Sequence, residues 1–332
     1  MSRTPITVLT GFLGSGKTTL LNRALSQPRF ARSAVIVNEF GAVGLDHELI
    51  AASRDQVVLL DNGCLCCEVR SDLIGTLNDL QLRRGAGLAP AFDRVVIETS
   101  GLADPSAIIA AVTGDRIVAA HFALGGVVTT LDAVNGLPTL ERHDEARRQL
   151  ALADRVVVTK ADVEAPSAAL NDAIAAANAL AEPITAQAAD AAETLSFELA
   201  PVLGKRVAAA TPAHRLRLSI RTLTLVRDEP IEPEVLDFFL TALEQTAGPA
   251  LLRVKALVCL STQPDRPLVV HGVQRLIHRT ATLDRWPGAD RRTRIVVIAM
   301  SDAIDDLADL LARVERMSQR TRAAREPAAA CR

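Results

Sequence analysis

Short apolar runs alternate with helical stretches through the first part of the chain. The runs are mostly apolar and show no regular alternation with polar residues, and they lie at residues 6–10, 34–38, 57–60, 94–99, 126–131 and 155–159. Strands that are buried on both faces of a parallel sheet have this composition. Leucines recur at helical spacing in residues 71–84, between the third and fourth runs. The pattern predicts an α/β fold, a doubly wound and mostly parallel sheet whose ligands bind at the carboxyl ends of the strands.

A different pattern follows an alanine-rich stretch without strand signals, from about residue 171 to residue 210. Strand-like runs lie at residues 216–226, 252–260, 267–272 and 294–299, and helices are expected at residues 232–246 and 302–317. This order predicts a smaller C-terminal α+β domain with a largely antiparallel sheet. We expect a first domain at 1–190, a linker at 191–212, the second domain at 213–320 and a disordered tail at 321–332.

The turn after the first apolar run is a phosphate-binding loop by its sequence. Residues 11–18, GFLGSGKT, match the pattern G-x-x-x-x-G-K-[ST] between a strand and a helix. Glycines let the backbone N–H groups converge on phosphate oxygens, and the helix N-terminus adds a partial positive charge. Lys17 would reach the β- and γ-phosphates, and the Thr18 hydroxyl would ligate magnesium. The expected nucleotide-binding residues are Gly11, Gly14, Ser15, Gly16, Lys17, Thr18 and Thr19. A glycine-rich turn that binds nothing is the alternative, and it leaves the agreement of motif with context unexplained.

The run at 155–159 ends in the sequence TKAD, residues 159–162. A guanine-specific pocket needs a carboxylate that accepts from N1–H and the exocyclic amine, and a long aliphatic stem over the purine face. Asp162 and Lys160 suit these two functions, so guanine is favoured over adenine. Thr159 stands where such motifs carry Asn, which changes or removes one supporting hydrogen bond. An ordinary loop at a strand end is the alternative.

Two more acidic segments follow predicted strands. Glu98 can hold magnesium through water, and the Gly101 N–H can contact a γ-phosphate and register its loss, as switch segments do. An acid that caps a strand-to-loop turn is the alternative for Glu98. Glu39, in the sequence NEFG, is placed like a residue of a first switch and would orient water or bind metal. We therefore name Lys17, Glu39, Glu98 and Gly101 as candidate catalytic residues.

A cluster of three cysteines provides the second unusual feature of the sequence. Cys64, Cys66 and Cys67 offer convergent sulfur donors for zinc or another thiophilic ion. A closed tetrahedral site needs a fourth ligand from elsewhere, and an open site suits a protein that must release its metal. Redox chemistry, or thiols that are buried without function, is the alternative. The remaining cysteines, Cys259 and Cys331, are expected in the core and in the tail.

Composition excludes some classes of partner. The 332-residue chain has a net charge of −2, 3% aromatic residues and no tyrosine, which argues against nucleic-acid binding. No apolar run reaches membrane-spanning length, and the first strand begins too early for a signal peptide. We expect a cytoplasmic protein, in which five cysteines serve as thiols or metal ligands rather than disulfides.

Taken together, these segments resemble the CobW-type metallochaperone GTPases, which are related to the urease and hydrogenase nickel-insertion GTPases. The matching segments are GFLGSGKTTLLN, VNEFG with LDHELI, NGCLCC, IETSGLADP and TKAD, followed by LLRVKALVCL, VVHGVQ and RTRIVVIAMSD. The resemblance implies a P-loop GTPase that binds GTP and magnesium. It also implies that the cysteines, with Glu39 a further candidate, bind zinc, cobalt or another divalent metal. Ala42 stands where many relatives carry an acid, which leaves the metal preference open.

The order of these segments suggests how they would work together. The cysteines lie between the two expected switches, at 38–47 and 98–104, so closure of the switches on the γ-phosphate would alter the sulfur site. We expect a GTP hydrolase that couples hydrolysis to delivery of a metal, zinc first, to a client protein that the sequence does not name. A monomer and a homo-oligomer are both compatible with the sequence. The alternatives are a thiol-redox-regulated NTPase and a nucleotide-dependent binding scaffold without metal delivery.

Overall fold

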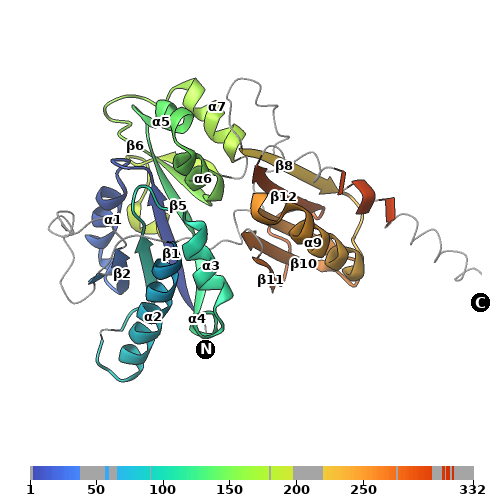
Figure 1. Ribbon diagram of the computed structural model, residues 1–332, viewed down its shortest axis with the longest axis horizontal. Helices are drawn as coiled ribbons and strands as arrows, with labels where there is room; N and C mark the ends of the chain where they lie inside the picture. The colour runs from blue at the N-terminus through green and yellow to red at the C-terminus, as the bar shows by residue number, and fades with distance from the viewer. Residues whose placement is uncertain are drawn as a thin grey trace, which may run out of the picture. The chain divides into compact units, whose positions relative to one another are not determined.

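The computed structural model describes two compact units of the chain. The described residues are 3–37, 57–59, 66–89, 91–178, 181–196, 220–273, 276–300, 309–310, 312–314 and 316–317. Those up to residue 196 belong to the first unit and those from residue 220 onward to the second. Each unit is built around one sheet (Figure 1). The domain limits expected from the sequence stay predictions.

The sheet of the first unit has seven strands. They are β1 (Thr4–Gly11), β2 (Ser33–Val37), β3 (Val57–Leu59), β4 (Arg94–Glu98), β5 (Phe122–Asp132), β6 (Arg155–Thr159) and β7 (Glu182–Thr185). Their order is β3-β2-β4-β1-β5-β6-β7, and every neighbouring pair is parallel. After β1 the chain forms β2, β3 and β4 on one side of that strand, and it then forms β5, β6 and β7 on the other side. The carboxyl end of β1, between β4 and β5, therefore lies at a change of winding direction, where such sheets bind ligands.

Within the described residues, helices lie between most of these strands along the chain and cover both faces of the sheet. They are α1 (Lys17–Leu25), η1 (Pro28–Phe30), α2 (Cys66–Gly85), α3 (Ser106–Gly114), α4 (Arg116–His121), α5 (Gly136–Arg142), α6 (Asp144–Leu152), α7 (Ala168–Ala177) and α8 (Ala191–Thr194). Leu20 and Leu21 of α1 pack on a core cluster that includes Leu9 of β1. Val8, the neighbour of Leu9, points to the opposite face and is fully buried as well. The expected doubly wound sheet is confirmed.

Strand β7 corrects the sequence analysis, which expected no strand between residues 171 and 210. Glu182–Thr185 pairs in parallel with β6 at the edge of the sheet. Pro183 lacks an N–H donor, and Ile184 is the one large apolar residue in the strand. An edge strand pairs on one side only, so it tolerates a proline and needs no continuous apolar run.

The second unit has a five-stranded sheet with one long helix. Its elements are β8 (Ile220–Arg227), α9 (Pro233–Ala247), η4 (Gly248–Ala250), β9 (Leu251–Leu260), β10 (Gln263–Val273), β11 (Leu276–Thr282) and β12 (Thr293–Met300). The strand order is β11-β10-β9-β12-β8, and all neighbours are antiparallel. The expected α+β fold with an antiparallel sheet is confirmed. The sequence analysis did not predict β11, a polar strand at the edge.

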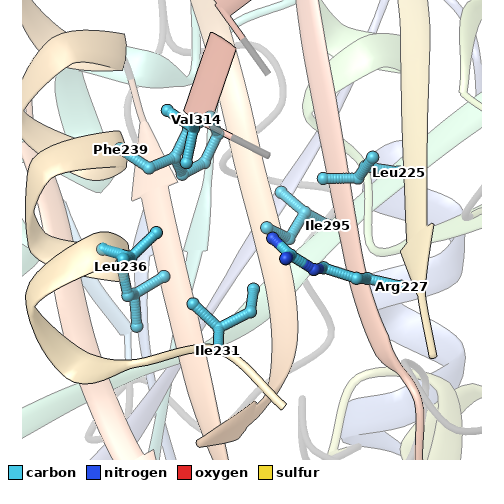
Figure 2. Close-up of a pocket in the computed structure, with 8 residues that line it drawn as sticks. Leu225, Arg227, Ile231, Leu236, Phe239, Ile295 and Val314 are labelled. Carbon is cyan, nitrogen blue, oxygen red and sulfur yellow. The ribbon is translucent and has the colours of Figure 1, made fainter. Parts of the chain in front are cut away.

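Helix α9 packs on this sheet through Phe239 and Leu243, which contact a core that includes Val254 and Val297. A small pocket remains beside the helix (Figure 2). Its lining residues are Leu225, Arg227, Ile231, Val235, Leu236, Phe239, Ile295 and Val314. Arg227 is the one polar side chain of this lining, so the pocket offers a single cation and neither an acid nor a nucleophile.

Of the helices in the described residues, none combines the length and the apolar character that crossing a bilayer requires.

Candidate functional site

The loop between β1 and α1 has a backbone that only glycine adopts readily. Gly11, Gly14 and Gly16 have φ angles of 143°, 68° and 90°. A Cβ on Gly11 would lie 2.3 Å from Thr130 Oγ1, so no larger residue fits between β1 and β5. The Ser15 hydroxyl lies 2.7 Å from the same Thr130 Oγ1. Thr130 of β5 therefore contacts the loop at both Gly11 and Ser15 and limits its movement.

Lys17, at the first position of α1, is 9% exposed. Its ammonium group donates to the carbonyl oxygens of Gly11, at 2.9 Å, and Phe12, at 3.3 Å. The cation is thus held against the inner side of the phosphate loop and at the N-terminus of α1. Both the ammonium and the helix N-terminus favour an anion at this place.

Thr18 and Glu98 meet although they are far apart in the sequence. The Thr18 hydroxyl donates to Glu98 Oε1 at 2.7 Å, and Glu98 is 5% exposed at the end of β4. Thr99, the next residue, donates its N–H to Leu9 O and its hydroxyl to Thr10 Oγ1, both at 2.9 Å. A hydroxyl and a carboxylate beside a phosphate loop are hard oxygen donors, the ligand type that Mg²⁺ prefers. These residues therefore fit a magnesium ion.

Gly101 lies directly against the phosphate loop. A Cβ added at this residue would lie 2.7 Å from the Leu13 nitrogen, so the segment approaches the loop as closely as its backbone allows. The ring of Phe12, on the same loop, lies 4.5 Å from the ring of His143 between centroids. The structure therefore brings the expected Gly101 segment, Lys17, Thr18 and Glu98 together at the carboxyl end of β1.

Lys160 is oriented by an ion pair at the end of β6. It is the one non-glycine residue with a positive φ, 56°, in the described residues, and its ammonium donates to Asp132 Oδ2 at 2.6 Å. Asp132 also accepts hydrogen bonds from the Val134 N–H and from both nitrogens of Asn135. Burial acts to raise the pKa of the Asp132 carboxyl, but the hydrogen bond from Lys160 and these further bonds outweigh it and hold the pKa below its ordinary value. The ion pair is therefore present at neutral pH.

Asp162 lies on the surface two residues later. Its carboxylate accepts a hydrogen bond of 2.6 Å from Gln187 Nε2, in the turn after β7. The two candidate base-binding residues, Lys160 and Asp162, thus have separate partners that orient them.

Thr159 connects this region to the phosphate loop. Its hydroxyl lies 2.7 Å from the carbonyl oxygen of Ser15 and 3.3 Å from that of Leu131. Its methyl group lies close to Gly16, where an added Cβ would be 3.2 Å away. The threonine that replaces asparagine therefore still supplies a hydrogen bond between the end of β6 and the phosphate loop.

The change Thr159→Val tests the importance of this bond. Valine has nearly the same shape, but it leaves the buried Ser15 carbonyl without its donor, so we expect the free energy of unfolding to fall by about 1–2 kcal/mol. Thr159→Ser keeps the hydroxyl and serves as the matched control, measured by urea unfolding. An unchanged free energy of unfolding in Thr159→Val would contradict a stabilising role for the hydrogen bond, and a loss confined to Thr159→Ser would assign the effect to the packing of the methyl group.

The candidate metal ligands lie mostly outside the described residues. Glu39 and Cys64 fall in undescribed segments, and for Cys66 and Cys67 only the backbone is described, as the first two residues of α2. Within the described part of the chain, no group of three or more His, Cys, Asp or Glu side chains could hold a metal ion. The cysteine site therefore stays a prediction.

Three residues near this site escaped the sequence analysis. Thr130 and Asp132 stand at the carboxyl end of β5, and both are polar and buried. Thr130 lies near the end of the expected run at 126–131 and Asp132 directly follows that run, and this position would have been the signal for both. Gln149 lies inside α6 and contacts the Gly101 segment. A glutamine within a helix carries no sequence signal of such a contact.

Two family models match this chain. The family model described as CobW/HypB/UreG, nucleotide-binding domain, matches residues 5–185. The model described as cobalamin synthesis protein cobW C-terminal domain matches residues 220–315.

Two curated relatives and one crystal structure are similar to this chain. The zinc chaperone YjiA of Escherichia coli is 32% identical over 303 residues, which cover 90% of this chain and 94% of that protein. The zinc chaperone CobW of Pseudomonas aeruginosa is 35% identical over 193 residues, covering 49% of this chain and 50% of that protein. The Zn(II)-bound structure of the YjiA GTPase from E. coli superimposes with a TM-score of 0.71 at 27% identity, covering 95% of this chain and 99% of that chain. The chain belongs to the CobW/HypB/UreG family and carries the C-terminal domain of CobW proteins.

Proposed function

We propose that this protein is a GTPase that couples GTP binding and hydrolysis to the delivery of a metal ion, zinc first, to a client protein. The observation that carries the proposal is the meeting of Lys17, Thr18, Glu98 and Gly101 at the carboxyl end of β1. The similarity to proteins named zinc chaperones supports the metal part of the proposal.

Each residue of this group has a role in hydrolysis. The phosphate loop and the N-terminus of α1 bind the phosphates, and Lys17 exchanges the carbonyls of its own loop for β- and γ-phosphate oxygens. Thr18 and Glu98 would hold magnesium, and the bound ion would supply positive charge beside the phosphates. The Gly101 N–H contacts the γ-phosphate, and Glu39 is the candidate for orienting water. Positioning and charge stabilisation account for most of the catalysis of phosphoryl transfer.

Recognition of guanine belongs to the segment after β6. Asp162 would accept from N1–H and the exocyclic amine, and the stem of Lys160 would lie over the purine face. The bond from Lys160 to Asp132 supports this assignment, because it fixes the lysine before any nucleotide binds.

The metal is cargo in this proposal, bound by Cys64, Cys66 and Cys67. The chain topology favours coupling of the two sites. Strand β3 runs parallel to β1, so the carboxyl end of β3 lies on the same side of the sheet as the phosphate loop. Cys66 follows Leu59, the last residue of β3, by seven positions. If nucleotide changes the affinity for metal, metal must change the affinity for nucleotide by the same factor.

Hydrolysis of GTP by the reduced protein, with and without equimolar zinc, tests the proposal. We expect GTP turnover to exceed ATP turnover and to change when zinc is added, and the change to disappear in Cys66→Ala. GTP turnover that responds neither to zinc nor to Cys66 would contradict coupling, and it would favour a redox-regulated NTPase or a binding scaffold. Absence of GTP turnover in all conditions would contradict the GTPase itself.

A further inference from the structure

Gln149 of α6 holds the segment that contains Gly101. The side chain is 0% exposed, and its Nε2 donates to the carbonyl oxygens of Gly101, at 3.1 Å, and Ala103, at 3.0 Å. Two carbonyl acceptors fix which end of the amide is nitrogen, because an amide oxygen cannot donate to them. Arg148, the preceding residue, forms an ion pair of 3.2 Å with Asp104 of the same segment.

Helix α6 is itself fixed to the rest of the first unit. The Thr129 hydroxyl of β5 donates to the backbone carbonyl of Gln149 at 2.9 Å. The buried amide of Asn178 donates to three carbonyls at the end of the helix, those of Leu150, Ala151 and Ala153. Gln149 therefore connects the Gly101 segment to a rigid support and not to another loop.

The two ends of the Gln149 amide differ in their surroundings. Both Nε2 hydrogens are used, whereas Oε1 is buried and accepts no hydrogen bond from the described residues. Buried acceptors are usually satisfied, and an unsatisfied one favours any change that brings a donor to it. The Gln149 amide donates to the main chain of residues 101–103, and Gly101 of this segment also lies against Leu13 of the phosphate loop.

We propose that Gln149 is a positioning residue for GTP hydrolysis, which holds the Gly101 carbonyl so that the Gly101 N–H faces the γ-phosphate. When a γ-phosphate draws this segment inward, Gln149 Oε1 accepts a main-chain N–H of the segment. The side chain thus favours the GTP-bound position of the segment over the GDP-bound one. This inference rests on the proposed GTPase function.

The variant Gln149→Met keeps the length and approximate volume of the side chain and removes both hydrogen-bonding groups. We expect it to lower kcat for GTP about tenfold and to weaken binding of a non-hydrolysable GTP analogue by a similar factor. The affinity for GDP should change by less than about twofold, since GDP has no γ-phosphate to draw the segment inward. Gln149→Asn serves as a second variant, because its amide is too short to reach the segment. It should likewise weaken binding of the GTP analogue and leave the affinity for GDP nearly unchanged.

Thr129→Val is the matched control, because it removes the bond from β5 to the backbone of Gln149 and leaves its side chain intact. It should lower the thermal stability and leave the ratio of the two nucleotide affinities unchanged. Equal effects of Gln149→Met on GDP and analogue binding, or an unchanged kcat, would overturn the inference. If the unmodified protein did not hydrolyse GTP, the proposed function would fail, while an unchanged affinity ratio in Gln149→Met would separately contradict the role of Gln149.

Discussion

Replacing Lys17 by methionine should lower GTP turnover by about 100- to 1,000-fold, the usual cost of removing a donor that stabilises transition-state charge. Methionine keeps the aliphatic stem at this nearly buried position and loses the ammonium that contacts the Gly11 and Phe12 carbonyls. Because the phosphate loop is also held by Thr130 and Thr159, the free energy of unfolding should change by no more than about 1–2 kcal/mol. Steady-state hydrolysis and urea unfolding of the same preparation measure the two quantities.

Lys17→Arg is the informative companion to this variant. It keeps the positive charge but places a planar guanidinium on a longer stem, which cannot occupy the position of a compact ammonium. We expect a loss of turnover close to that of Lys17→Met. Turnover within about tenfold of the unmodified protein in both variants would show that Lys17 does not contact the reacting phosphate.

Replacing Gly11 by alanine should lower the free energy of unfolding by about 2–6 kcal/mol, the sum of backbone strain and overpacking. The φ of 143° is unfavourable for alanine, and its Cβ would collide with the side chain and carbonyl of Thr130 and with Ser15 Oγ. Neither β1 nor β5 can move aside easily, because the two strands are paired along the whole of β1.

Gly14→Ala is the matched control in the same loop. Gly14 has a φ of 68°, and no atom of the described residues lies within 4 Å of an added Cβ. Only the left-handed conformation is then penalised, which costs about 1–2 kcal/mol. Equal destabilisation by the two variants, measured by urea unfolding, would mean that the contact with Thr130 adds nothing to the strain.

The phosphate loop and most of the first sheet could be predicted from the sequence, because both depend on local patterns. The loop has a fixed motif, and buried parallel strands carry uninterrupted apolar residues, as in the centres of Arg94–Glu98 (RVVIE) and Arg155–Thr159 (RVVVT). Strand β7 could not be predicted this way. Its place in the sheet depends on pairing with β6, and four residues that include a proline carry no pattern of their own.

The contacts that complete the candidate site were beyond the reach of sequence patterns for a similar reason. Thr159 and Ser15 are 144 positions apart, and Gln149 and Gly101 are 48 positions apart. A motif indicates which residue types bind a phosphate or a base, but a contact between distant segments depends on the packing of the whole unit. For this reason the sequence analysis treated Thr159 only as a departure from a motif and did not consider Gln149.

The bond between Thr159 and Ser15 has a consequence for substrate selection. Thr159 immediately precedes Lys160 and donates a hydrogen bond to the Ser15 carbonyl. This bond connects the segment expected to contact the base to the backbone of the phosphate loop. A purine that fits poorly would displace this segment and, through Ser15, the geometry of the phosphate loop. A nucleotide with the wrong base would then bind more weakly, and it would also be hydrolysed more slowly once bound. The same contact would therefore affect both the affinity and the rate of hydrolysis.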